Sequence, residues 1–233
     1  ANASGVTAFQ FNVYDSGETA NGGANTISQF ILITVTAVND APTITNLSGD
    51  SLSYSEGAGA VVIEQGANAL VADIDSTNCD TGTLTISIPS GGDSAEDVLS
   101  ILNQGTGAGQ IGVSGSTVTY GGVTIGAFTG GSNGTNLVIT LNSSATPTAV
   151  TALIKNITYE NTDAASPTTG ARTVRYVLTD GDGGTSANYD TTVTVTAVND
   201  APVLALGATN LLTNGSFESG GTGWTGNSGV EAT

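Results

Sequence analysis

The chain has 233 residues, and its 20 acidic and 3 basic side chains give a net charge of −17, with no histidine. Such a surface repels nucleic acids and anionic membranes, whereas it suits divalent cations, which prefer oxygen ligands. A Ser-His-Asp triad is excluded because it needs histidine. No apolar run approaches the ~18 residues of a membrane span. We therefore expect no enzyme, no nucleic-acid partner and no membrane span in this segment.

Strands are predicted along most of the chain, because Val, Ile and Thr either run together or alternate with polar residues. The segments with these patterns are FILITVTAV (30–38), TLTISI (83–88), NLVITL (136–141), TVRYVLT (173–179) and TTVTVTAV (191–198). TYGGVTI (119–125) places a Gly-Gly pair between strand-like flanks, which predicts a hairpin. DVLSIL (97–102) is ambiguous, and we favour a strand.

One short helix is predicted in TPTAVTALIKNI (146–157), which has a proline near its start. Its apolar residues recur at the helical spacing i, i+3, i+4 and i+7, and they are Val150, Leu153, Ile154 and Ile157. We therefore expect an all-β protein with a single short helix.

The phrase VTAVNDAP occurs twice, at 35–42 and at 195–202. In both copies a strand, an acidic turn and a final strand precede the phrase, which indicates a linear array of modules. We divide the chain into the C-terminal part of one module (1–38), a linker (39–42), a complete module (43–198), a second linker (199–202) and the start of a further β module (203–233). The abrupt opening predicts a piece of a longer protein.

Acidic residues lie near the start of the complete module, after predicted strands and in a tight turn. They are Glu56 in YSEG, Asp73 and Asp75 in VADID, Glu160 and Asp163 in YENTD, and Asp180 and Asp182 in TDGDGG. Strand ends meet at the two poles of a β-sandwich, where clustered carboxylates would raise one another's pKa and destabilise the fold. A bound cation removes that penalty. Asn and Asp also form turns, so a purely structural role for the linker phrase stays open.

The order Glu, A-x-D-x-D, D-x-G and V-x-V-x-x-V-N-D-x-x-P resembles cadherin repeats. It is similar to the bacterial cadherin-like modules of large surface adhesins, which carry VTAVNDAP junctions. The resemblance covers roughly 40–202 and, in part, 1–39. It implies seven-stranded Greek-key β-sandwich modules of cadherin or immunoglobulin-like type in tandem, with calcium (Ca2+) at each junction. Because the module is long for such a repeat, we expect an insertion near 89–150.

The resemblance also implies which residues bind calcium. The first junction would use Asn39, Asp40, Asp73, Asp75 and Asp180. The second junction would use Glu56, Glu160, Asn199 and Asp200.

The function that follows from the resemblance is a calcium-stiffened stalk or adhesion segment of a repetitive protein that is extracellular or on the cell surface. Its partners would be the neighbouring modules of the same chain. One alternative is a subunit of an extracellular filament, in which strands of the first module pair with another copy. A second alternative is glycan binding after Pro202, because NLLTNGSFESGGTGW (210–224) resembles the opening of jelly-roll carbohydrate-binding modules. Trp224 would then stack on a sugar, or else fill the core of the next module.

Overall fold

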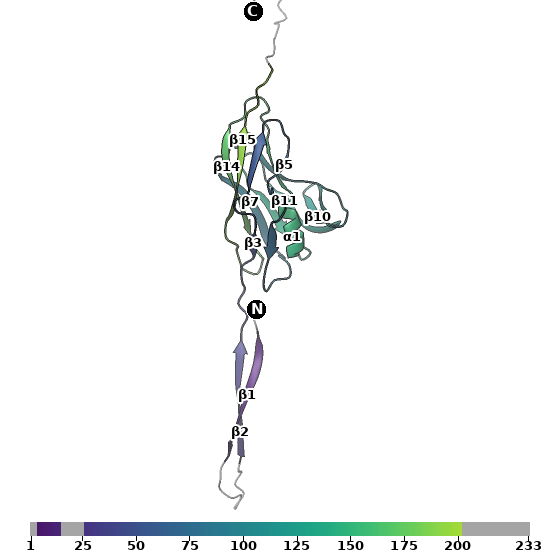
Figure 1. Cartoon of the computed structure of the whole chain (residues 1–233). Coiled ribbons are helices and arrows are strands. Elements are labelled where there is room, and N and C mark those ends of the chain that lie inside the picture. Colours follow the sequence, from purple (N-terminus) through teal and green to yellow (C-terminus); the bar gives the residue numbers. More distant parts are fainter. Residues whose placement is uncertain (1–3, 15–25, 202–233) are drawn as a thin grey trace, which may run out of the picture. The chain divides into compact units, whose positions relative to one another are not determined.

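The computed structural model describes residues 4–14 and 26–201 (Figure 1). Within these residues strands dominate and one short helix occurs, which confirms the all-β prediction. The first two strands, β1 (Gly5–Tyr14) and β2 (Thr26–Val35), pair as an antiparallel hairpin. Every residue of both strands is exposed.

An eight-stranded sheet forms the larger layer of the module that follows the first linker. In sheet order its strands are β4 (Ser51–Ser55), β15 (Tyr189–Thr196), β14 (Gly170–Leu178), β7 (Thr83–Ser90), β12 (Leu137–Leu141), β11 (Val123–Thr129), β10 (Thr117–Tyr120) and β9 (Ile111–Ser114). Neighbouring strands are antiparallel except β4 and β15, which run parallel.

The hydrophobic core lies between this sheet and a smaller one. The smaller sheet consists of β5 (Val61–Val62), β13 (Ile157–Asn161) and β8 (Asp97–Ile101). Tyr54 of β4 and Tyr159 of β13 meet edge to face, with ring centroids 5.0 Å apart. Every second residue of β14 from Arg172 to Leu178 is buried, as the alternation of a strand with one covered face requires. The molecule therefore contains the predicted β-sandwich.

The predicted helix is present as α1 (Pro147–Ile154), but it ends earlier than predicted, since Ile157 is the first residue of β13 and not part of the helix. Thr146 caps it, since its Oγ1 accepts a hydrogen bond from the Ala149 amide. The helix buries Val150, Leu153 and Ile154. It lies against β6 (Leu70–Ala72), which pairs with β3 (Thr43–Thr45), and the Val71 amide donates to Thr151 Oγ1 at 2.9 Å.

The region 89–150, where we expected an insertion, contributes strands to both the larger and the smaller sheet of the module. DVLSIL is a strand, as favoured, and it is β8 in the smaller sheet. The predicted Gly-Gly hairpin joins β10 to β11, and both Gly121 and Gly122 have positive φ. With β9, these strands extend the edge of the larger sheet beyond β12. The module 43–198 contains β3 to β15, so the implied count of seven strands is wrong for it.

Candidate functional site

Three segments that are distant in sequence meet at the first linker. β6 ends at Ala72, and Asp73 and Asp75 follow it directly. β14 ends at Leu178, after which a bridge between Thr179 and Thr185 encloses the acidic turn DGDGG. The linker phrase Asn-Asp-Ala supplies the third segment. The turn and the strand end thus both reach the linker.

Hydrogen bonds join the linker to the acids of the module. Asn39 Nδ2 donates to Asp180 Oδ2 at 2.8 Å, and the Asp40 amide donates to Asp75 Oδ2 at 3.1 Å. Asp73 Oδ1 accepts from the Asp75 amide at 3.2 Å and from the Ser76 amide at 3.1 Å. All five residues assigned to the first junction therefore lie together. We call Asn39, Asp40, Asp73, Asp75 and Asp180 the junction cluster.

Asp180 is the buried centre of this cluster, with an exposed fraction of 0%. Its Oδ1 accepts from the amides of Asp182 at 2.8 Å and Gly184 at 2.9 Å. A Cβ on Gly184 would lie 2.1 Å from Asp180 Oδ2 and 2.8 Å from Asn39 Nδ2. Glycine at 184 is therefore required for the linker to reach the acidic turn. Asp182, which the resemblance left out, also approaches the cluster by accepting from Ser76 Oγ at 3.2 Å.

Electrostatics at the junction cluster favour a positive partner. Asp73 Oδ2 is buried without a hydrogen-bond partner. Burial raises the pKa of Asp73, and the neighbouring Asp75 adds to the rise. Burial also raises the pKa of Cys79 to about 11, helped by the charges of Asp73 and Asp180, so this thiol stays protonated at neutral pH. The donors left for a cation are oxygens, which are the ligands that calcium prefers.

The side chains of the junction cluster are not arranged as the ligands of a metal ion in this structure. In the described part of the chain, no group of three or more His, Cys, Asp or Glu side chains is positioned to hold a metal ion. The carboxylates of the cluster accept backbone and amide N–H groups, as turn-forming residues do. Cation binding would need side-chain rotation in these loops. The donor chemistry and the unpartnered oxygen of Asp73 fit calcium, while the observed geometry is that of a hydrogen-bonded turn cluster.

The residues assigned to the second junction are joined by fewer hydrogen bonds than those of the junction cluster. The Val198 amide donates to Glu56 Oε2 at 2.7 Å, and Glu56 Oε1 is buried without a partner. Asn199 and Asp200 are exposed, and Asn199 Nδ2 donates to the Asp200 carbonyl at 3.3 Å. Among the residues described, Glu160 makes no hydrogen bond with these three. Of the four residues assigned to this junction, Glu56 is the one whose side chain bonds to the strand end that leads into the linker.

Glu160 does not follow a strand, so that prediction was wrong. It lies within β13 and pairs with Val98 of β8. The strand continues to Asn161 because that side chain is buried and donates to Asp97 Oδ1 at 3.3 Å. Asp163 caps a turn, since its Oδ1 accepts from the amides of Ala165 and Ser166, and these bonds lower its pKa.

A buried ion pair is a second polar feature, and the sequence reading missed it. Arg172 is fully buried on β14, with Nε 3.3 Å from Asp97 Oδ2. Its guanidinium also donates to the carbonyls of Thr168 and Gly170, and Tyr159 donates to Asp97 Oδ1. A signal was available, because the alternation in GARTVRYVL places Arg172 on the same face as the core residues of that strand.

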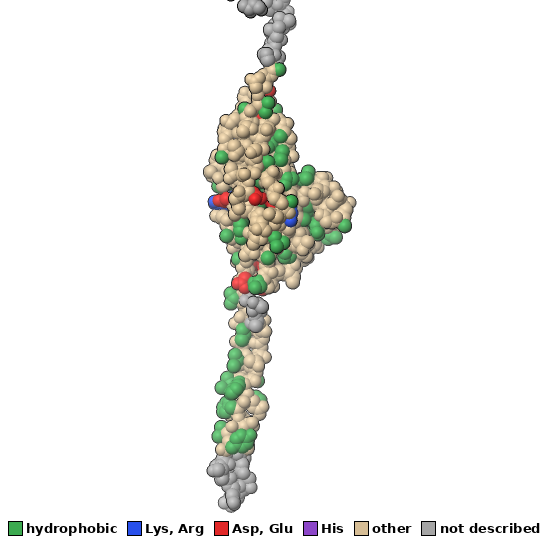
Figure 2. Space-filling view, viewed as in Figure 1, with side chains coloured by type: hydrophobic (Ala, Val, Ile, Leu, Met, Phe, Trp, Pro, Cys, Tyr) green, Lys and Arg blue, Asp and Glu red, His purple; other side chains and the backbone are tan. Residues whose placement is uncertain are grey.

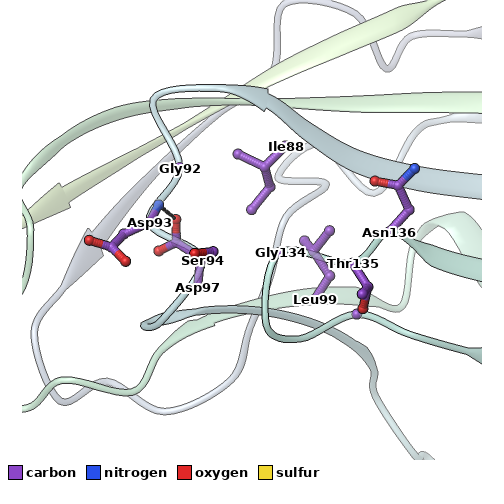
Figure 3. Close-up of a pocket in the computed structure, with 10 residues that line it drawn as sticks. Ile88, Gly92, Asp93, Ser94, Asp97, Leu99, Gly134, Thr135 and Asn136 are labelled. Carbon is purple, nitrogen blue, oxygen red and sulfur yellow. Dashed lines mark hydrogen bonds between the residues drawn. The ribbon is translucent and has the colours of Figure 1, made fainter.

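A cavity of about 240 Å³ adjoins this ion pair (Figure 3). It is lined by Ile88, Gly92, Asp93, Ser94, Asp97, Leu99, Gly131, Gly134, Thr135 and Asn136. The Asp93 amide donates to Asp97 Oδ2 at 2.7 Å, and Asp93 Oδ2 accepts from Thr168 Oγ1 at 3.0 Å, so both acids that line the cavity are already engaged. Sites for small molecules usually measure ~300–1,000 Å³. We therefore regard the junction cluster, and not this cavity, as the candidate site.

Other predicted features lie outside the described residues. These are the segment 203–233, including Trp224 and the phrase similar to carbohydrate-binding modules. In the part of the chain that the structure describes, no helix has the length and apolar character needed to cross a membrane.

Comparisons with known proteins identify no family for this chain. No family model matches the chain, and no curated protein matches it. Among solved structures, the seventh ScaB type I cohesin from Pseudobacteroides cellulosolvens is similar at 12% identity with a TM-score of 0.32. The match covers 70% of this chain and 96% of the cohesin.

Proposed function

We propose that this chain is a segment of an extracellular or cell-surface stalk or adhesin, built from cadherin-like modules whose junctions are stiffened by calcium. The observation that carries the proposal is the contact between linker and module. Asn39 bonds to Asp180, and Asp40 bonds to Asp75, although 141 and 35 residues separate these pairs in sequence. The phrase that repeats in the sequence is therefore also the phrase that contacts the acidic loops.

The residues of the junction cluster would act by fixing the linker. Calcium, when bound, would supply the positive charge that four neighbouring aspartates lack. Asp73 and Asp75 would contribute carboxylate oxygens from the end of β6, and Asp180 would contribute from the turn after β14. Asp40 would contribute from the linker itself. Because these ligands come from separate segments, shared coordination would restrict rotation of the linker against the module.

Calcium binding of the strength typical of extracellular modules would be effective only in an extracellular setting. Calcium sites of extracellular modules have dissociation constants of ~10⁻⁴–10⁻³ M, which only millimolar calcium saturates. At about 1 mM calcium and a dissociation constant of about 0.1 mM, each ion adds roughly 1.4 kcal/mol to the free energy of unfolding. Total stabilities are ~5–15 kcal/mol, so a few ions would change the rigidity of a junction.

Calorimetric titration of the chain with calcium tests the proposal. We expect binding in the range of about 10⁻⁴–10⁻³ M and a melting temperature several degrees higher in calcium than in EDTA. Asp75→Asn should weaken binding, because it removes a carboxylate that faces the linker. Asp190→Asn is the matched control, since it removes the same charge from a residue that pairs with Arg175. Absence of calorimetric heat together with equal melting temperatures would refute the calcium role.

A further inference from the structure

Three buried oxygen atoms in the core of the module have no hydrogen-bond partner. They are Asp50 Oδ2, Glu64 Oε2 and the hydroxyl of Tyr176, and we call these three residues the core oxygen cluster. The exposed fraction is 4% for Glu64 and 0% for Tyr176, so bulk water does not reach these side chains. Most buried polar atoms in proteins have a partner, and a buried oxygen without one indicates a bound water or ion.

The strands bring Asp50 and Tyr176 to the same face of the larger sheet. β4 buries Leu52 and Tyr54, so the alternation of the strand turns Asp50 inward as well. The Thr192 amide of β15 donates to the Asp50 carbonyl at 2.8 Å, which extends the pairing of β4 to this residue. Tyr176 belongs to the buried row of β14, and β15 alone separates β14 from β4.

Glu64 comes from the opposite layer of the sandwich. It follows β5, and the Ile63 amide donates to the Ile157 carbonyl at 3.0 Å just before it. Glu64 Oε1 accepts from the amides of Asn68 at 2.8 Å and Ala69 at 3.1 Å. These bonds fix the carboxylate and leave Oε2 as its free oxygen.

The two carboxylates both act on the tyrosine. Burial raises the pKa of Tyr176, and the negative charges of Glu64 and Asp50 raise it further. Both carboxylates therefore lie close enough for their charges to reach the phenol, which stays neutral. The cluster thus combines two anionic groups and one neutral hydroxyl in the core.

No basic side chain of the described residues neutralises these carboxylates. The chain has three basic side chains, Lys155, Arg172 and Arg175, and Figure 2 shows how sparse they are on one face of the module. Both arginines pair with other aspartates, and neither Asp50 nor Glu64 belongs to an ion pair in the described part of the chain. Buried charges without a counter-charge destabilise a fold. A cation from solution would remove this cost.

We propose that Asp50 and Glu64 bind a divalent cation of the calcium type inside the β-sandwich, at a site separate from the junction cluster. Carboxylate oxygens are the ligands that such hard cations prefer, and two of them balance the charge of one ion. Asp50 is only partly buried, so an ion can enter beside it. The bound ion would connect β4 in the larger sheet to the loop after β5 in the opposite layer.

Melting temperatures of the whole chain in EDTA and in millimolar calcium test this site. Asp73→Asn combined with Asp75→Asn provides a background in which the junction cluster has lost two carboxylates. We expect calcium to raise the melting temperature of this background variant by about 3–6 °C. Adding Asp50→Asn should remove most of that rise. Asp190→Asn is the matched control, since it is the same exchange on a residue that pairs with Arg175, and it should leave the rise in place.

Glu64→Gln separates a cation ligand from a structural acceptor. The glutamine can still accept the amides of Asn68 and Ala69, while the buried negative charge is gone. In EDTA this variant should therefore melt at the same or a higher temperature than its parent. Added to the background variant, it should remove most of the rise that calcium produces.

Three outcomes would overturn the inference. The first is a background variant that calcium does not stabilise, which would leave the proposed function of the junction cluster intact. The second is a calcium effect that neither Asp50→Asn nor Glu64→Gln reduces. The third is a lower melting temperature of Glu64→Gln in EDTA, which would mean that a buried water already satisfies the carboxylate. If Glu64→Gln alone removes the response of the parent to calcium, the core site stands and the junction role fails.

Discussion

Two buried tyrosines in the same core differ in what their hydroxyl groups contribute to the stability of the fold. Tyr159 donates its hydroxyl to Asp97, which also accepts from Arg172. Tyr176 is fully buried, and its hydroxyl has no partner. Burial raises the pKa of both hydroxyls, so both stay neutral. A buried hydroxyl without a partner costs free energy, whereas a bonded one that completes an ionic network stabilises the fold.

Matched Tyr→Phe variants measure this difference. Tyr159→Phe should lower the free energy of unfolding by about 1–3 kcal/mol, because Asp97 loses a donor in a buried site. Tyr176→Phe should leave it unchanged or raise it by up to about 1 kcal/mol. Urea unfolding of both variants provides the comparison. An equal loss in both would mean that the Tyr176 hydroxyl has a partner, such as a buried water.

The raised pKa of Asp73 predicts a pH effect that distinguishes a cation site from an ordinary turn. A carboxyl with a raised pKa in the folded state takes up a proton more readily than in the unfolded state, so its ionisation weakens folding as the pH rises through that pKa. Asn escapes this loss and can still accept the amides of Asp75 and Ser76. In EDTA at neutral pH, Asp73→Asn should melt at the same or a higher temperature than the parent.

The advantage of Asp73→Asn should shrink as the pH falls towards the ordinary carboxyl value of 3.8. In millimolar calcium the order should reverse, because the variant has lost a ligand. Scanning calorimetry of the parent and the variant at several pH values, in EDTA and in calcium, measures the melting temperatures that test this prediction. A variant that melts lower than the parent in EDTA as well would mean that Asp73 acts through its turn alone.

At the scale of secondary-structure elements, the spacing of apolar residues predicted the strands, the hairpin and the helix that the local sequence determines. The alternating strands, the Gly-Gly hairpin and α1 all occur in the predicted segments, although β2, β15 and α1 end two or more residues earlier than predicted. The sequence could not show that β9 to β11 join the larger sheet, because sheet neighbours depend on long-range packing. Nor could it end β13 correctly, since Asn161 continues the strand through contacts with residues about sixty positions earlier, Glu96 and Asp97. The junction cluster was more predictable, because the repeated phrase itself marks the linker.

The helix offers a clean test at this scale. Thr146 accepts the Ala149 amide, so Thr146→Ala should lower the free energy of unfolding by about 1 kcal/mol. Thr148→Ala is the control, because Thr148 is exposed within the first turn and Ala has the higher helix propensity. The control should be neutral or slightly stabilising. Similar losses in the two variants would show that the cap contributes nothing.

At the scale of the whole molecule, the two junctions differ in the carboxylates that the described residues bring to them. The first linker is bonded to Asp75 and Asp180, whereas before the second linker Glu56 accepts from the Val198 amide. More carboxylates at comparable rigidity give tighter calcium binding. Asp73→Asn combined with Asp75→Asn should therefore cost more calcium affinity than Glu56→Gln combined with Glu160→Gln. Calorimetric titration of both double variants decides the ranking, and a larger loss from the glutamate pair would reverse it.

The parallel pairing of β4 with β15 has a mechanical consequence. Ser51–Ser55 runs beside Thr192–Thr196 in the same direction, so the chain enters this pair at one end and leaves it at the other. Tension along the polypeptide would therefore slide the two strands lengthwise. The bonds at the two ends of the pair, from Thr192 to Asp50 and from Glu56 to Thr196, would be strained at the same time. A strand pair loaded in shear resists pulling better than one that is opened from one end.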